Sequence, residues 1–81
     1  MKINVIKKIV ENESLENLEK VEEEIYNENE TLSLDIEGVD MGEKLTHVIA
    51  AIWIKKEMEQ SGSELKVAIR KYTQKVRNSI S

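Results

Sequence analysis

The side chains that could perform acid-base or metal chemistry are one histidine, His47, and sixteen carboxylates, with no cysteine. In a helix, His47 lies one turn after Glu43, so the two side chains can pair. As a metal site this pair supplies two ligands where a structural zinc ion takes four, and a second chain would have to complete it. We therefore expect no metal site and interpret His47 as a surface or interface partner of Glu43.

Nucleophilic catalysis needs a hydroxyl or thiol with an ordered base beside it. Ser61, Ser63 and Ser79 occupy turn or terminal positions instead. The three glycines are isolated and do not form a phosphate-binding loop. The glutamates lie mostly opposite the apolar positions of their helices, which indicates a solvated face rather than a carboxylate-bridged metal centre. The sequence predicts no catalytic residue and no cofactor, so we expect a protein that is not an enzyme.

The net charge of −4 hides a division along the chain, because residues 11–43 hold thirteen acidic residues and one lysine. That acidic segment can pack beside the basic first and last segments, or it can present an acidic patch to a basic partner. The last helix has a basic flank that could contact phosphates, so a small nucleic-acid-associated protein is the alternative function. The candidate contacts are Lys66, Arg70, Lys71, Lys75 and Arg77.

The elements that position these side chains are expected to be helices, because the chain has no proline and 35% of its residues are charged. Apolar residues recur at helical spacing over residues 3–10. A second helix is predicted over 15–28, with the Ser14 hydroxyl as its N-cap. Its apolar stripe is narrow and its remaining surface is mainly glutamate, so it depends on packing for stability.

Two further helices are predicted in the second half of the chain. Asp40 and Glu43 form a capping-box pattern that begins a helix over 41–59, with Glu43 reaching back to the amide of Asp40. Gly62 can take the left-handed conformation that ends this helix, and Ser63 can cap the next one. So short a turn favours antiparallel third and fourth helices.

An extended segment is expected between the second and third helices. Over residues 31–37 the apolar side chains alternate with polar ones, which is the period-2 pattern of a segment with one buried face. This segment can lie across the helices as a covering arm, which we favour, or pair with the same segment of a second chain. The apolar members are Leu32, Leu34 and Ile36.

The third helix is apolar at every position from 48 to 54. Its side chains therefore point in all directions, which is typical of a helix at the centre of a fold. Three short neighbours cover only part of its circumference, so we expect a homodimer; a compact monomer that covers the helix unaided is the alternative. The predicted interface consists of Ala50, Trp53, Ile54 and Met58. The favoured function is a non-enzymatic helical protein-protein interaction module that self-associates through this helix.

With 81 residues, the chain has room for one domain over residues 1–81. No apolar run approaches the roughly 18 residues of a membrane span, and the first residues do not form a signal peptide, so we expect a cytoplasmic protein without a membrane partner. The expected fold is all-α, a small four-helix bundle-like domain.

The chain also resembles a known family over most of its length. The resemblance is carried by the opening Met1–Glu11 (MKINVIKKIVE) and by Met41–Leu45 (MGEKL), which precedes the apolar helix. The family consists of small uncharacterised bacterial proteins known only as a domain of unknown function. The resemblance implies a short helical protein, and it assigns no catalytic or binding residue. The acidic region 27–40 departs from the shared pattern.

Overall fold

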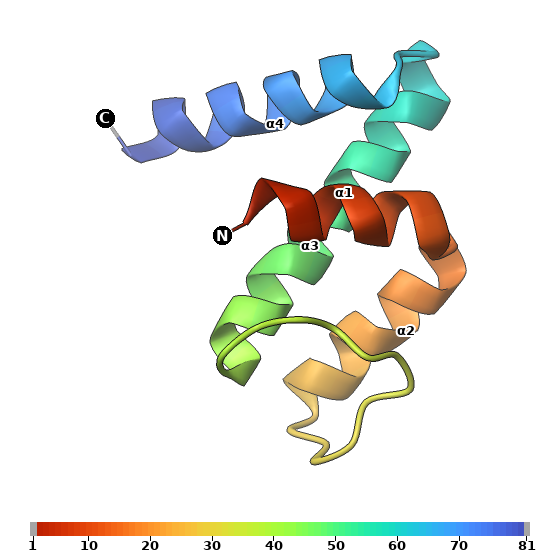
Figure 1. Cartoon of the computed structure of the whole chain (residues 1–81), viewed down its shortest axis with the longest axis vertical. Coiled ribbons are helices and arrows are strands. Elements are labelled where there is room, and N and C mark those ends of the chain that lie inside the picture. The colour runs from red at the N-terminus through yellow and green to blue at the C-terminus, as the bar shows by residue number, and fades with distance from the viewer. Residues whose placement is uncertain (1, 81) are drawn as a thin grey trace.

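The chain folds into four helices, as predicted, in a computed structural model that describes residues 2–80 without the side chain of Ile80 (Figure 1). The first and third helices run two residues further than expected, and the second stops two residues earlier. Among the described residues there is no strand, so the all-α class is confirmed. The elements are α1 (Ile3–Asn12), α2 (Leu15–Tyr26), α3 (Met41–Ser61) and α4 (Leu65–Ile80).

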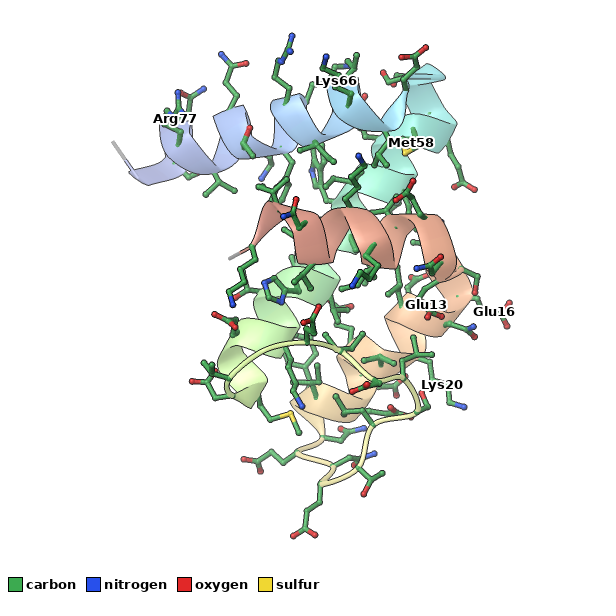
Figure 2. All side chains as sticks on the ribbon, in the orientation of Figure 1. Glu13, Glu16, Lys20, Met58, Lys66 and Arg77 are labelled. Carbon is green, nitrogen blue, oxygen red and sulfur yellow. The ribbon has the colours of Figure 1, made fainter. Side chains whose placement is uncertain are left out.

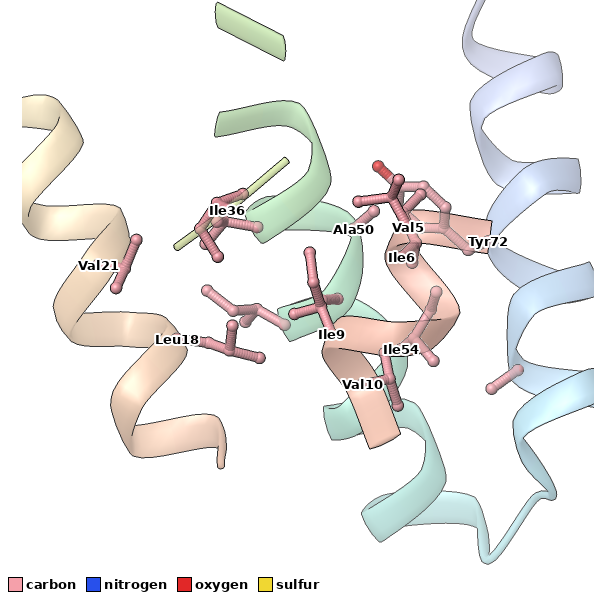
Figure 3. Packing of buried hydrophobic residues seen from close by; sticks show 14 of the residues in the cluster. Val5, Ile6, Ile9, Val10, Leu18, Val21, Ile36, Ala50, Ile54 and Tyr72 are labelled. Atoms are coloured by element: carbon pink, nitrogen blue, oxygen red, sulfur yellow. The ribbon is translucent and has the colours of Figure 1, made fainter. Parts of the chain in front are cut away.

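The central element is α3, which packs against each of the other three helices. Because α3 is apolar on most sides, it is covered by α1, by α2 and by α4 on different parts of its circumference. Figure 3 shows the apolar side chains of α1, α2, α4 and the 27–40 connection converging around α3. The expected central position of this helix is therefore confirmed. Its buried residues are His47, Val48, Ala50, Ala51, Ile52 and Ile54.

Two of the predicted helix starts have the expected side-chain caps. The backbone N–H of Asn17 donates to Ser14 Oγ at 3.1 Å, and that of Glu43 donates to Asp40 Oδ1 at 2.8 Å. Each bond satisfies an amide that has no partner within its helix. The reciprocal bond of the capping box differs by one residue, because Glu43 Oε1 accepts from the amide of Val39 at 3.1 Å.

The corner between α3 and α4 is formed at Gly62, whose φ of 69° confirms the predicted left-handed conformation. One expectation at this corner was wrong. The position flanking α4 is Glu64, and Ser63 lies with its hydroxyl 2.6 Å from Ser61 Oγ. Beyond the corner, α4 turns back and packs on α3, since the rings of Tyr72 and Trp53 lie 5.6 Å apart between the two helices (Figure 1).

The connection from residue 27 to residue 40 is the covering arm that we favoured. Its apolar side chains turn inward, since Ile36 is 3% exposed and Leu32 and Leu34 are partly buried, whereas the polar residues between them are exposed. The amide of Ser33 donates to Glu24 Oε1 at 2.8 Å, which ties the arm to α2. The arm therefore lies on its own chain and covers the core between α2 and α3.

His47 joins three parts of the chain inside the core. Its side chain is fully buried, its Nε2 accepts from the amide of Lys2 at 3.0 Å, and its Nδ1 donates to the carbonyl of Glu37 at 2.8 Å. This pattern requires the neutral ring with its hydrogen on Nδ1. The predicted surface pairing with Glu43 was wrong, because the arm and the start of α1 close over the ring. One imidazole thus connects α1, α3 and the arm.

Replacing His47 by alanine should destabilise the fold by about 2–4 kcal/mol, because the substitution leaves a cavity and removes the partner of two partly buried backbone groups. Urea unfolding followed by circular dichroism measures this change. Lys20→Ala, at an exposed position of α2, is the control and should cost less than about 1 kcal/mol. Equal stability of His47→Ala and wild type would contradict the structural role of the ring.

Candidate functional site

The part of α3 that its neighbours leave open is a single stripe along the helix. Its residues recur every three or four positions and therefore share one face. All are exposed except Trp53, which is partly buried, and Ile49 is 36% exposed. We call this set the α3 stripe, and it consists of Thr46, Ile49, Trp53, Lys56 and Gln60.

Trp53 is held in place by an aromatic neighbour on α4. Its ring centroid lies 5.6 Å from that of Tyr72, with the rings tilted by 52°. Tilted pairs at this distance contribute about 0.5–1.5 kcal/mol beyond their buried area. Burial also raises the pKa of Tyr72, because the phenolate form is poorly solvated there. The contact with Tyr72 therefore holds Trp53 in place, while part of the Trp53 side chain remains exposed.

The four predicted interface residues do not lie on one surface. Ala50 and Ile54 are 0% and 1% exposed, so the expectation that a second copy must cover them was wrong. Helical periodicity places Met58 about 140° around α3 from Trp53, away from the α3 stripe. A helical wheel gives directions but not the reach of the neighbouring helices, and one chain covers these positions unaided. Trp53 alone among the four belongs to the open stripe.

A groove lies between α1 and α4, and sequence reasoning missed it. It encloses about 540 Å³, and its apolar residues are Ile3, Leu65 and Ile69. Lys7 and Lys66 line it from opposite helices, and Glu64 and Asn4 complete the lining. We call this the α1–α4 groove. Leu65 also borders a smaller hollow of about 280 Å³ beside Met58 and Val10, where Lys55 Nζ donates to the carbonyl of Val10 at 3.1 Å.

The five predicted nucleic-acid contacts on α4 fall on different sides of the helix. Lys66, Arg70 and Arg77 share one face by their spacing, and all three are exposed. Lys71 forms an ion pair with Glu57, because its Nζ lies 3.1 Å from Glu57 Oε2. The pKa of Glu57 is lowered first by its side-chain hydrogen bond with Ser61 and then by Lys71. Lys75 is exposed on a side of α4 different from that of Lys66.

Opposite charges gather at opposite ends of the molecule. The C-terminal part of the acidic α2 and the arm form one end (Figure 1), and α4 with basic residues such as Lys66 and Arg77 forms the other (Figure 2). The expectation that the acidic segment packs beside the last helix was therefore wrong. Among residues 2–80 the ion pairs are Lys71 with Glu57 and Lys8 with Glu37, the latter at 4.0 Å. Most of the charge on both ends is left to solvent or to partners.

The side chains that could support chemistry are not grouped. Within the described part of the chain, no three histidine, aspartate or glutamate side chains lie close enough to hold a metal ion. Both ring nitrogens of His47 are bonded to the backbone. None of the described helices combines the length and apolar character that crossing a bilayer requires.

These features define a small all-α domain with a covered central helix, an open stripe and a groove. The chain belongs to the family of unknown function DUF6952, whose model matches residues 1–81. The resemblance to a domain of unknown function is thereby confirmed, and the bacterial origin that it implied stays a prediction. No curated protein and no solved structure matches the chain.

The burial of Tyr72 predicts a loss of stability in alkaline solution. Because its pKa is raised in the folded protein, the unfolded chain ionises first, so the free energy of unfolding falls as the pH rises above about 10. Tyr72→Phe should remove this part of the pH dependence. Urea unfolding at about pH 8 and pH 11 tests it, with Tyr26→Phe on an exposed ring as the matched substitution. Parallel losses in wild type and Tyr72→Phe would contradict this assignment.

Proposed function

We propose that the protein is a non-catalytic helical interaction module that self-associates through the α3 stripe. The observation that carries this proposal is that the central helix has an exposed isoleucine, Ile49, one turn before a partly exposed tryptophan, Trp53. In a chain with 35% charged residues, the stripe has one charged member, Lys56. A partly exposed tryptophan beside an exposed aliphatic side chain is typical of the centre of an interface, because aromatic residues are enriched there.

The order of residues in the α3 stripe is compatible with a symmetric contact between the α3 helices of two copies of the chain. An antiparallel contact of two α3 helices centred on Trp53 places Thr46 opposite Gln60 of the second copy. The two Lys56 positions then lie about 9 Å apart along the axis, so their ammonium groups can turn outward to solvent. Two-fold dimers of this kind are the commonest soluble oligomers.

The shape of the single chain supports an assembly. Its accessible surface is 5528 Å², whereas a folded monomer of this mass exposes about 5,000 Å². Its radius of gyration is 12.4 Å, against about 11.7 Å for a compact domain of this length. The α3 stripe spans about 21 Å and is one helix wide, which is less than a standard interface. We therefore expect a dimer with a dissociation constant of roughly micromolar order.

The proposal includes a non-catalytic role and a cytoplasmic location, and it gives nucleic-acid binding less support. The commitment of the only imidazole to two backbone groups supports a non-catalytic role, because that ring has no free nitrogen to accept a proton. Nucleic-acid binding through α4 has less support, because its cations lie on different sides and one is paired with Glu57. A cytoplasmic location stays part of the proposal.

Replacing Ile49 by glutamate should abolish the dimer. At about 100 µM, roughly a hundredfold above the expected dissociation constant, wild type should sediment as two copies of the 9.3 kDa chain and Ile49→Glu as one. Val39→Glu is the matched control: it places the same charge at an apolar residue that is 86% exposed on the arm, and it should remain dimeric. A wild-type mass of 9.3 kDa at this concentration would refute self-association.

A further inference from the structure

We propose that the α1–α4 groove binds an acidic amphipathic helix of a partner protein. The floor of the groove is apolar and accessible, since Ile3 is 39% exposed and Leu65 and Ile69 are partly buried. These three side chains come from two helices that both pack on α3, so the floor has a rigid support. An amphipathic helix covers such a floor with its own apolar side chains.

The length of the groove limits what enters it. Ile3 and Lys7 are separated by one helical turn on α1, and Leu65 and Ile69 by one turn on α4, so each wall is about 6 Å long. Two apolar anchors of a partner helix spaced four residues apart match this length. Binding that uses two anchors is weak, with a dissociation constant of roughly tens of micromolar.

The charges around the groove favour a partner segment with negative charge. Lys7 and Lys66 line it from the two walls, against Glu64 as the one acidic member of the lining. Arg70 follows one turn after Lys66 on α4 and is exposed. Carboxylates beside the partner's apolar anchors would therefore face lysines on both sides. The smaller hollow shares Leu65 with the groove and is bordered by Glu11 and Glu59, which repel carboxylates, so an acidic helix is confined to the α1–α4 groove.

A nucleic acid is the less suitable ligand for this surface. Phosphates would use the cations but not the apolar floor, and Glu64 at the edge would repel them. No aromatic side chain lines the groove, so bases have no surface for stacking. An acidic amphipathic helix uses both the floor and the cations, and it is therefore the partner that the geometry favours.

This groove is separate from the α3 stripe, so the two proposals can fail independently. The groove is lined by α1 and α4, and the nearby hollow reaches α3 at Lys55 and Met58. Helical periodicity places those α3 positions on the side away from Trp53. A dimer paired through the α3 stripe would leave both of its grooves open.

The test is an NMR titration of the isotope-labelled full chain with a designed helical peptide of about 14 residues, carrying two leucines four residues apart and glutamates beside them. Backbone amide shifts should concentrate at Ile3, Lys7, Leu65, Lys66 and Ile69. A counterpart peptide with lysine in place of each glutamate should bind at least about tenfold more weakly. Sedimentation of the same samples keeps this result apart from self-association.

Matched variants test the floor and the cations of the groove. Ile3→Glu and Lys7→Glu should each weaken binding of the acidic peptide by at least about fivefold. Val67→Glu, at a residue of α4 that is 42% exposed outside the groove lining, and Lys20→Glu on α2 should stay within about twofold. Because Lys7 is exposed, Lys7→Glu keeps the test valid if Ile3→Glu fails to fold.

Three results would overturn the proposal. One is equal affinity for the acidic and the lysine peptides. Another is a set of shifts centred on the α3 stripe. The third is shifts at Lys66, Arg70 and Arg77 on adding a DNA duplex of about 16 base pairs, with none on adding the acidic peptide.

Discussion

The fold depends on covering α3, a helix with apolar side chains around most of its circumference. Apolar area removed from water contributes about 25 cal/mol per Å², and a small chain has few other sources of stability. The chain has no cysteine for a disulfide, and within residues 2–80 no three histidine, aspartate or glutamate side chains lie close enough to hold a metal ion. The other three helices and the arm are therefore arranged by how each covers a part of α3. The α3 stripe is what this arrangement leaves open.

The buried His47 shows how a polar group can belong to such a core. Its two nitrogens pair with the Lys2 amide and the Glu37 carbonyl, which would otherwise be left without partners beside α3. No buried side-chain nitrogen or oxygen atom of the described residues lacks a hydrogen-bond partner. The ring also fixes where α1 begins and where the arm ends relative to α3. A single side chain thus sets the register of three segments that are far apart in sequence.

Local patterns predicted most of the fold. Helix spacing, the caps at Ser14 and Asp40, the turn at Gly62 and the alternation of the arm depend on neighbours within a few residues, so they can be recognised without tertiary information. Burial of Ala50 and Ile54, the backbone partners of His47 and the groove depend on where distant helices cross. Helical periodicity gives the direction of each side chain but not what stands opposite it. The available signal for the groove was an exposed Ile3 and a partly buried Ile69 at helical positions, and that signal can be recognised only once α1 and α4 are placed.

Trp53 gives the most direct test of the claim that the open stripe of α3 is an interface, because it is the only tryptophan in the chain. Its fluorescence reports whether the indole is in contact with water. On dilution from about 100 µM to 10 nM, across the expected dissociation constant, the emission maximum should shift to longer wavelength along a monomer-dimer binding curve, while the circular dichroism at the same concentrations stays helical. An emission maximum that is constant over the whole range would contradict the account, since Trp53 would then have the same environment in every state of association.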